Sequence, residues 1–257
     1  MQVVRAVSVL SAILAAILVR PGVAHESFKP AAPGPQTPPA ARRYDPTDQY
    51  EAQSIEGWRV LVNREFLRRD ATLADSTLTL LRFQLYQITR RLPLAPLGRL
   101  RKIAIWVEQS EPHHPCMAYH PDAGWLREHG MNPDKARCVE IAHARNFLTW
   151  TIDQPWMVLH ELAHGYHDQF LGGYGNPEIR AAYDRVIQAR LYDAVLRAGG
   201  ATERAYAATN PMEYFAETTE ALFGTNDFYP FVRAELRQHD PQTLQLLERL
   251  WDLPKKK

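Results

Sequence analysis

The sequence predicts an α+β domain in which strands dominate the first half of the chain and helices dominate the second. Three segments rich in β-branched and aromatic residues, at 58–62, 102–107 and 138–151, are typical of strands. Beyond residue 176, the apolar residues recur at helical spacing. Strands followed by helices, instead of a regular alternation of the two, indicate an α+β architecture.

The first 49 residues are expected to lie outside the folded domain. Arg5, the apolar run 6–19 and the small residues 22–24 together form the pattern of a secretory signal peptide over residues 1–24. The run is shorter than the roughly 20 residues of a membrane-spanning helix, although an uncleaved anchor is an alternative. The Pro-rich segment 25–49 is typical of an extended linker. We therefore expect a secreted, periplasmic or cell-envelope protein.

The folded domain is expected to span residues 50–254, with the basic residues 255–257 as a tail. Apolar residues spaced by three and four, ending before Pro93, predict the first long helix. The expected elements of the first half are a strand at 58–62, a helix at 73–91, a strand at 102–107 and a loop rich in His and Pro at 111–122. The expected helices of the second half are 177–198, 210–224 and 241–253.

Residues 138–151 are expected to form one or two strands. Because Ile141–Leu148 directly precedes the apolar helix described below, this segment is a candidate for the edge of the sheet. An exposed edge strand can bind an extended peptide through main-chain hydrogen bonds. An ordinary inner strand is the alternative.

The charge balance gives no sign of a nucleic-acid-binding protein. Lys and Arg number 30 and Asp and Glu number 29, so the net charge is close to zero. An extended basic surface is the usual signature of nucleic-acid binding. We expect a monomer without stable membrane association once the signal peptide is removed.

The chain contains two cysteines, Cys116 and Cys138. An exported protein folds in an oxidising compartment, which favours a disulfide between them. Two free thiols are the alternative. A zinc site built from these cysteines is not expected, because they lack the close spacing of such sites.

The most informative motif is His160-Glu161-Leu162-Ala163-His164, which lies in an apolar stretch without Gly or Pro until Gly165. On an α-helix, residues i and i+4 share one face, so both imidazoles can bind one zinc ion. The Glu after the first His can then act as general base toward a metal-bound water. Two core histidines are the alternative, but burying them beside a Glu without a shared partner is costly.

A catalytic zinc site needs a third protein ligand. One variant of the motif takes a His six residues after its second His and has a Gly midway, but this chain has Phe170 and His167 there. A Glu from a later helix is the remaining common solution. Residues 210–224 fit such a helix, with Asn210 as its N-cap and Pro211 in its first turn.

Three acids, Glu213, Glu217 and Glu220, share one face of that helix. Solvated surface charge is one interpretation, but Glu213 and Glu217 lie among apolar residues. Metal-bound His residues usually donate their other ring N–H to a carboxylate. We assign Glu213 as the ligand and Glu217 as the carboxylate that orients a His, although spacing alone leaves their order open.

These motifs resemble the catalytic domain of the anthrax lethal factor-like zinc peptidases, which include the bacterial Pro-Pro endopeptidases. Members carry His-Glu-x-x-His on one helix and an acidic-aromatic-aromatic-Ala-Glu string on a later one, matched here by residues 213–217. The resemblance covers roughly residues 102–253 and implies that Glu213 is the zinc ligand. It also implies that Tyr206, seven residues earlier, stabilises the oxyanion. The chain lacks the large delivery portion of the toxins, so a toxin role is not implied.

The sequence therefore predicts a zincin-like metallopeptidase domain, in which a small mixed or antiparallel sheet packs on the active-site helix and a mostly helical half follows. We expect one Zn²⁺ bound by His160, His164 and Glu213, with Glu161 as general base and Tyr206 as oxyanion donor, acting on a peptide or protein substrate. One alternative is an exported binding protein with a structural zinc. Another is a zinc amidase that acts on a non-peptide substrate.

Overall fold

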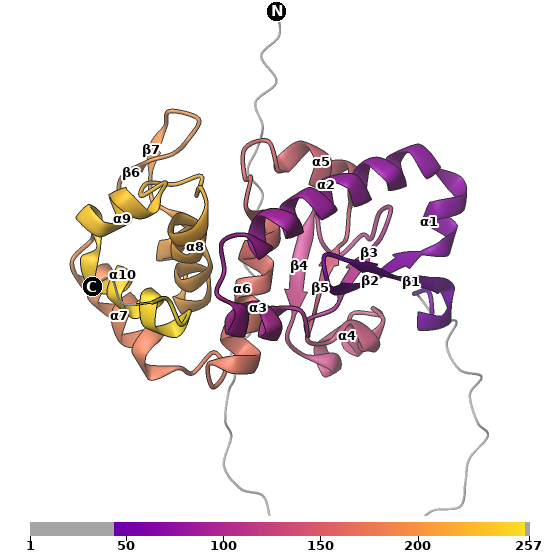
Figure 1. Ribbon diagram of the computed structural model, residues 1–257, viewed down its shortest axis with the longest axis horizontal. Helices are drawn as coiled ribbons and strands as arrows, with labels where there is room; N and C mark the ends of the chain where they lie inside the picture. Colours follow the sequence, from indigo (N-terminus) through magenta and orange to yellow (C-terminus); the bar gives the residue numbers. More distant parts are fainter. Residues whose placement is uncertain (1–43, 255–257) are drawn as a thin grey trace, which may run out of the picture. The chain divides into compact units, whose positions relative to one another are not determined.

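The computed structural model describes residues 44–254, which form one α+β unit (Figure 1). The expected signal peptide, most of the expected linker and the basic tail lie outside the described residues. The predicted α+β class is confirmed. The main sheet is mixed: β2, β3 and β5 run parallel, and the antiparallel strands β1 and β4 form its two edges. Its strands, in the spatial order β1-β2-β3-β5-β4, are β1 (Tyr50–Ile55), β2 (Trp58–Asn63), β3 (Ile105–Val107), β4 (Met117–His120) and β5 (Cys138–Ile141).

Helices make up most of the remaining structure. Those up to the motif are α1 (Arg64–Arg69), α2 (Ala71–Thr89), α3 (Leu94–Leu100), α4 (Ala123–Glu128), α5 (Ala144–Trp150) and α6 (Met157–Phe170). Those after it are α7 (Pro177–Gln188), α8 (Pro211–Phe223), α9 (Arg233–His239) and α10 (Pro241–Leu250). The short elements are the 3-10 helices η1 (Thr47–Gln49), η2 (Pro133–Lys135) and η3 (Tyr206–Ala208) and the hairpin strands β6 (Val195–Leu196) and β7 (Thr202–Glu203). Within residues 44–254, none of these helices is both long and apolar enough to cross a membrane.

The first hairpin explains why the strand predicted at 58–62 begins where it does. Glu56 and Gly57 both have positive φ, 51° and 89°, as a two-residue type I′ turn requires. The turn reverses the chain between β1 and β2, and Ile55 pairs with Trp58. The strand β1 was not predicted from the sequence, and the six residues before it also belong to the folded unit. Asp45 accepts a hydrogen bond from Asn63 Nδ2 at 2.8 Å, so the expected linker ends before residue 44.

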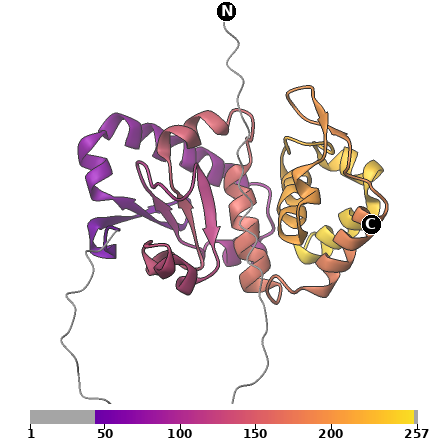
Figure 2. The same cartoon turned by 180° about the vertical axis from the view of Figure 1, so that it is seen from behind.

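The main core lies between one face of the sheet and the helices α2 and α6 (Figures 1 and 2). Residues alternate along a strand, so one set faces these helices and the other faces away. The inward set is fully buried and includes Val60, Val62, Ile105, Val107, Val139 and Ile141. Further along the chain, Trp251 stacks on Tyr166 of α6 at 4.1 Å and on Phe215 of α8 at 5.8 Å. This aromatic stack fixes α8 and the end of α10 against α6.

Gly165 allows strand β4 to lie very close to α6. A β-carbon at this position would fall 2.7 Å from Ile103 Cδ1 and 2.9 Å from Tyr119 Cε2. Any larger residue would force these neighbours apart. The glycine inside the helix therefore has a packing role, and it brings the backbone of Tyr119 within reach of the motif.

The edge strand next to α6 is β4, so the assignment of Ile141–Leu148 as the edge was wrong. Its first residue ends β5, an inner strand between β3 and β4, and most of the remainder forms α5. The edge lies instead within the predicted loop 111–122. His143 caps α5 through a contact between its Nδ1 and the N–H of Asn146, which ends the strand and starts the helix. The edge strand β4 has only four residues and lies beside several prolines, so its sequence resembles that of a loop.

The helix predicted at 177–198 was also too long, because α7 ends at Gln188. Arg190 adopts a φ of 54°, which a right-handed helix cannot accommodate. The chain then forms the antiparallel hairpin of β6 and β7. Gly199 and Gly200, which we had interpreted as the end of the helix, form its turn, and Gly200 has a φ of 91°.

The expected disulfide between Cys116 and Cys138 is absent, and both thiols are free. The two residues lie at opposite ends of the β4–β5 ladder. Cys138 pairs with His120, whereas the carbonyl of Cys116 accepts from the N–H of Ala142 at 2.7 Å. Four residues of register correspond to about 13 Å along a strand, and a disulfide joins Cα atoms at most about 7 Å apart.

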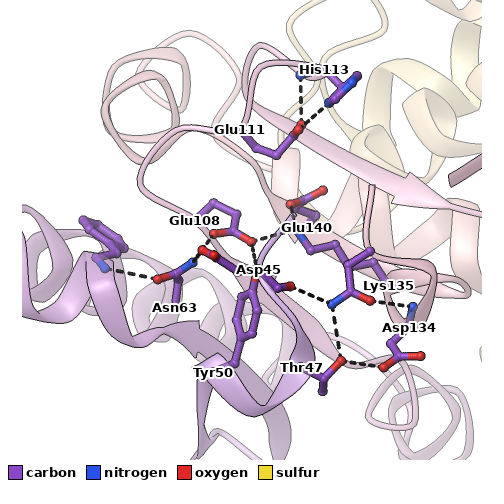
Figure 3. A network of polar contacts seen from close by, with 12 residues as sticks. Asp45, Thr47, Tyr50, Asn63, Glu108, Glu111, His113, Asp134, Lys135 and Glu140 are labelled. Atoms are coloured by element: carbon purple, nitrogen blue, oxygen red, sulfur yellow. Dashed lines mark hydrogen bonds and ion pairs between the residues drawn. The ribbon is translucent and has the colours of Figure 1, made fainter. Parts of the chain in front are cut away.

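On the sheet face away from α6, a buried ion network ties three segments together (Figure 3). The Lys135 ammonium, only 3% exposed, lies 2.6 Å from Glu108 Oε1 and also contacts Glu140. Burial raises the pKa of Glu140, but the hydrogen bond from His120 and the charge of Lys135 outweigh it and lower the pKa to about 2. The remaining partners of Glu108 are the Tyr50 hydroxyl and Asn63 Nδ2.

Replacing Lys135 with Ala should lower the free energy of unfolding by about 3–5 kcal/mol, because two buried carboxylates would lose their cation. Urea denaturation at neutral pH measures this change. The control is Lys102→Ala, which removes an exposed ammonium and should change stability by less than about 0.5 kcal/mol. Equal effects of the two variants would contradict a stabilising role for the network.

Candidate metal centre

The two histidines of the motif lie on one face of α6, near its start. α6 begins at Met157, and the N–H of His160 donates to the carbonyl of Trp156 at 3.0 Å. One turn later comes His164, whose ring centroid is 4.8 Å from that of His160. Both side chains are largely buried, and Leu159 and Leu162 fill the core beside them. This arrangement agrees with the i, i+4 spacing expected from the sequence.

The helix predicted at 210–224 forms as α8 and carries Glu213 in its first turn. Asn210 caps it, and its side chain accepts from the N–H groups of Met212 and Glu213 at 2.9 Å. α8 packs along α6. Glu213 Oε2 therefore lies 3.0 Å from His160 Nε2 and 3.2 Å from His164 Nε2. The structure brings together the three residues assigned to one metal site.

The electrostatics of this cluster fit a bound cation. One ligand atom from each of the three side chains lies within 4.8 Å of the others, as expected for atoms around one ion. Burial raises the pKa of Glu213, but the charges and hydrogen bonds of His164 and His160 outweigh it and hold this pKa well below its usual range. Two imidazole nitrogens and one carboxylate are a donor set typical of catalytic zinc. The residues present therefore fit the expected ion.

Glu220, not Glu217, makes the hydrogen bond to His160. Glu220 Oε1 lies 2.7 Å from His160 Nδ1, whereas Glu217 Oε1 is 3.7 Å away, beyond hydrogen-bond distance. The assignment of Glu217 as the orienting carboxylate therefore needs correction. Both acids share the helix face with Glu213, and the crossing of α6 and α8 decides which one reaches the ring. Helical spacing could not distinguish them.

The Glu161 carboxylate points to the edge of the sheet. Its Oε2 accepts a hydrogen bond from the backbone N–H of Tyr119 in β4 at 2.8 Å. The side chain is half-buried and comes from the same helical turn as His160 and His164. Glu161 remains the candidate general base, because it follows His160 directly in the chain.

Tyr206 lies in η3, which directly precedes α8 and packs against it. Its ring centroid is 6.4 Å from that of His160. Burial and then the charges of Glu213 and Glu161 raise the pKa of the phenol. The hydroxyl therefore stays protonated at neutral pH and can act as a hydrogen-bond donor near the cluster.

Two further residues, His167 near the end of α6 and Tyr174 in the loop after it, pack against each other with ring centroids 5.2 Å apart. His167 is fully buried between Tyr174 and Phe215, and neither ring nitrogen has a hydrogen-bond partner among the described residues. Burial and the charge of His164 lower its pKa to about 4, so the ring is neutral. Burial, and then the neighbouring Tyr119 and Asp168, raise the pKa of the Tyr174 phenol. No local pattern marks Tyr174, because it lies in the loop after α6.

Comparisons with protein-family models, with curated proteins and with solved structures found no match to this chain. A functional conclusion therefore depends on the geometry and chemistry of the cluster itself.

Three substitutions should rank in their effect on zinc affinity. Glu213→Ala removes a ligand and should weaken binding most. Glu220→Gln disturbs the orientation of His160 and should weaken binding about 10–100-fold. Glu217→Gln should change it less than Glu220→Gln. Competition with a chromophoric chelator measures all three dissociation constants, and a larger loss for Glu217→Gln than for Glu220→Gln would reverse the roles of these two acids.

Proposed function

We propose that this protein is an exported, zinc-dependent endopeptidase with a zincin-like catalytic domain. The observation that carries the proposal is the convergence of His160, His164 and Glu213 from two helices, with Glu161 beside them. Two imidazoles and a carboxylate leave the fourth position of a tetrahedral zinc site open, as catalysis requires. The resemblance of residues 213–217 to the second motif of the lethal factor-like peptidases also supports it.

Zinc held by His160, His164 and Glu213 would supply Lewis acidity, which would lower the pKa of water to about 7 and polarise a substrate carbonyl. Glu161 accepts the proton of the attacking water and later gives it to the leaving amine. The Tyr119 N–H holds the Glu161 carboxylate at the edge of β4 while it is unprotonated. The Tyr206 hydroxyl donates a hydrogen bond to the oxygen on which negative charge develops.

Strand β4 supports a peptide as the substrate class. Residues 116 and 120 pair with β5 through main-chain hydrogen bonds, so those between them alternate in direction. The N–H and C=O groups of Met117 and the C=O of Tyr119 therefore point away from β5, to the edge, where the Tyr119 N–H already donates to Glu161. An extended substrate can add to this edge as another strand.

A purely structural zinc is less consistent with this arrangement. Structural zinc sites have four protein ligands. Among the described residues, the group around Glu213 contains no fourth His, Cys, Asp or Glu. The open position favours hydrolysis over a role in folding alone.

Glu161→Gln should keep one zinc per chain and lower kcat for peptide cleavage by about 10²–10⁴-fold, because the base is lost while the ligands remain. Mass spectrometry of a digested peptide library measures cleavage, and elemental analysis measures zinc. The matched control, Glu128→Gln, changes an exposed acid on α4 and should have no effect. Cleavage by Glu161→Gln at the wild-type rate would refute the proposal.

Tyr206→Phe should lower kcat by about 10²–10³-fold with little change in KM, because a donor to the transition state is removed. Steady-state kinetics on a peptide found in the library screen measures both constants. The comparison variant is Tyr183→Phe, since the Tyr183 hydroxyl donates to the carbonyl of Ala208 behind η3. An equal loss of kcat in the two variants would contradict a direct role for the Tyr206 hydroxyl in the reaction.

A further inference from the structure

The outer face of α2 changes character halfway along the helix. The exposed side chains between residues 72 and 79 are polar or acidic, and they are Thr72, Asp75, Ser76 and Thr79. The exposed side chains of the second half are aromatic or cationic, and they are Arg82, Phe83, Tyr86 and Arg90. At about 100° per residue these four positions fall within about 100° of one another around the helix axis. They form one convex stripe on the side opposite the buried Leu81 and Leu85.

The stripe and the turn after it gather exposed apolar side chains. Phe83 is 56% exposed and Tyr86 is 46% exposed. Leu94, the first residue of α3, follows Pro93 and is 87% exposed. Half of the exposed large hydrophobic side chains in the described part of the chain therefore lie between residues 83 and 94. Single exposed hydrophobic residues are common, but a group of them marks a contact surface.

The same segment carries an excess of positive charge. Residues 76–107 contain six Lys and Arg residues and no Asp or Glu, whereas the whole chain has a net charge of only +1. Within residues 44–254, Arg99 alone of these six forms an ion pair, with Asp252 at 3.6 Å. Exposed arginines elsewhere do pair with carboxylates, as shown by Arg180, Arg190 and Arg249. The positive charge on the end of α2 is therefore uncompensated.

Two of these arginines lie over aromatic rings. The Arg90 guanidinium is 5.7 Å from the centroid of Tyr86, and that of Arg91 is 4.7 Å from the centroid of Trp156. Trp156 and Phe83 also line a hollow of about 210 Å³ between α2 and the loop before α6. The acid of that loop, Asp153, is exposed and forms no ion pair with the arginines of α2. Contact with a ring keeps each guanidinium beside the apolar groups without neutralising it.

We propose that Arg82, Phe83, Tyr86, Arg90, Arg91 and Leu94 form a basic aromatic surface, which docks the protein on an anionic phospholipid bilayer. Guanidinium groups bind phosphate oxygens through paired hydrogen bonds. Aromatic and Leu side chains enter the boundary between headgroups and acyl chains. Such contact is peripheral and reversible by salt, so it differs from the stable membrane association that the sequence did not lead us to expect. The proposal does not depend on the peptidase activity.

An acidic protein is the competing partner. It would match the charge of the basic aromatic surface, but it would need a pocket for each protruding apolar side chain. Leu94, at 87% exposed, protrudes most. A fluid bilayer supplies anionic phosphates and an apolar layer beneath them without preformed pockets. A convex stripe with apolar side chains between arginines therefore fits a bilayer better than a folded partner.

The test measures cosedimentation of the purified full chain with two kinds of vesicle. One is pure phosphatidylcholine, and the other contains phosphatidylcholine and phosphatidylglycerol in equal parts. We expect binding to the anionic vesicles to be at least tenfold stronger in about 0.1 M NaCl, and this preference to disappear in about 1 M NaCl. A retained apolar N-terminal segment would bind both kinds of vesicle, so the ratio between them reports on charge.

Two matched variants locate that charge. Substituting Arg82→Gln, Arg90→Gln and Arg91→Gln together should weaken binding to the anionic vesicles at least tenfold. The control removes three exposed arginines far along the chain, through Arg180→Gln, Arg190→Gln and Arg249→Gln, and should bind like wild type. An equal loss in both variants would show that net charge alone drives binding, and it would overturn the proposal.

A further variant tests the apolar part of the surface. Phe83→Ser combined with Leu94→Ser should also weaken binding to the anionic vesicles at least tenfold, because the side chains that enter the bilayer are removed. Both residues are exposed, so the variant should unfold at the wild-type Tm. Undiminished binding of this variant, or the absence of any preference for anionic vesicles in wild type, would overturn the proposal. Salt-sensitive binding to soluble polyglutamate without binding to vesicles would identify an acidic protein partner and overturn it as well.

Discussion

The packing of α8 against α6 is the constraint on which the rest of the site depends. It places the Glu213 carboxylate against two imidazoles that are one helical turn apart. Burying these groups is costly unless they share a partner, so apolar contacts must hold the helices together. Trp251 supplies such a contact, because it stacks on Tyr166 of α6 and on Phe215 of α8. Phe215, which lies between Glu213 and Glu217 in the sequence, therefore helps to position the candidate metal centre.

The other side of α6 depends on a second close approach. Gly165 leaves room for Tyr119, and β4 can then lie directly against the helix. The backbone N–H of Tyr119 reaches Glu161 only because of this proximity. One glycine thus links the edge of the sheet to the orientation of the proposed base. The two sides of the helix differ: one brings together the candidate metal ligands, and the other positions a carboxylate beside a strand edge.

The parts of the site that the sequence predicted are those set by local geometry. The spacing of His160 and His164 follows from the helical repeat, and Asn210 and Pro211 mark the start of α8. The parts that failed depend on tertiary register. Glu217 and Glu220 share one helix face, and only the crossing of α6 and α8 selects Glu220. The edge strand β4 has only four residues, which is too short for a periodic pattern to be visible in the sequence. Its pairing with β5 places the two cysteines at opposite ends of the ladder, so they cannot form a disulfide.

The row of acidic residues along α8 is costly to bury without positive charge nearby. Glu213, Glu217 and Glu220 follow one another along a single, largely buried face. His160 contacts Glu213 through Nε2 and Glu220 through Nδ1, so a single ring connects the first acid to the third. It cannot also satisfy Glu217, whose outer oxygen has no donor. Since hydrophobic packing fixes the helix where it is, the acids cannot move out to water. Positive charge beside this row, from His160 and from a cation at the proposed metal site, would offset the cost of burying these acids.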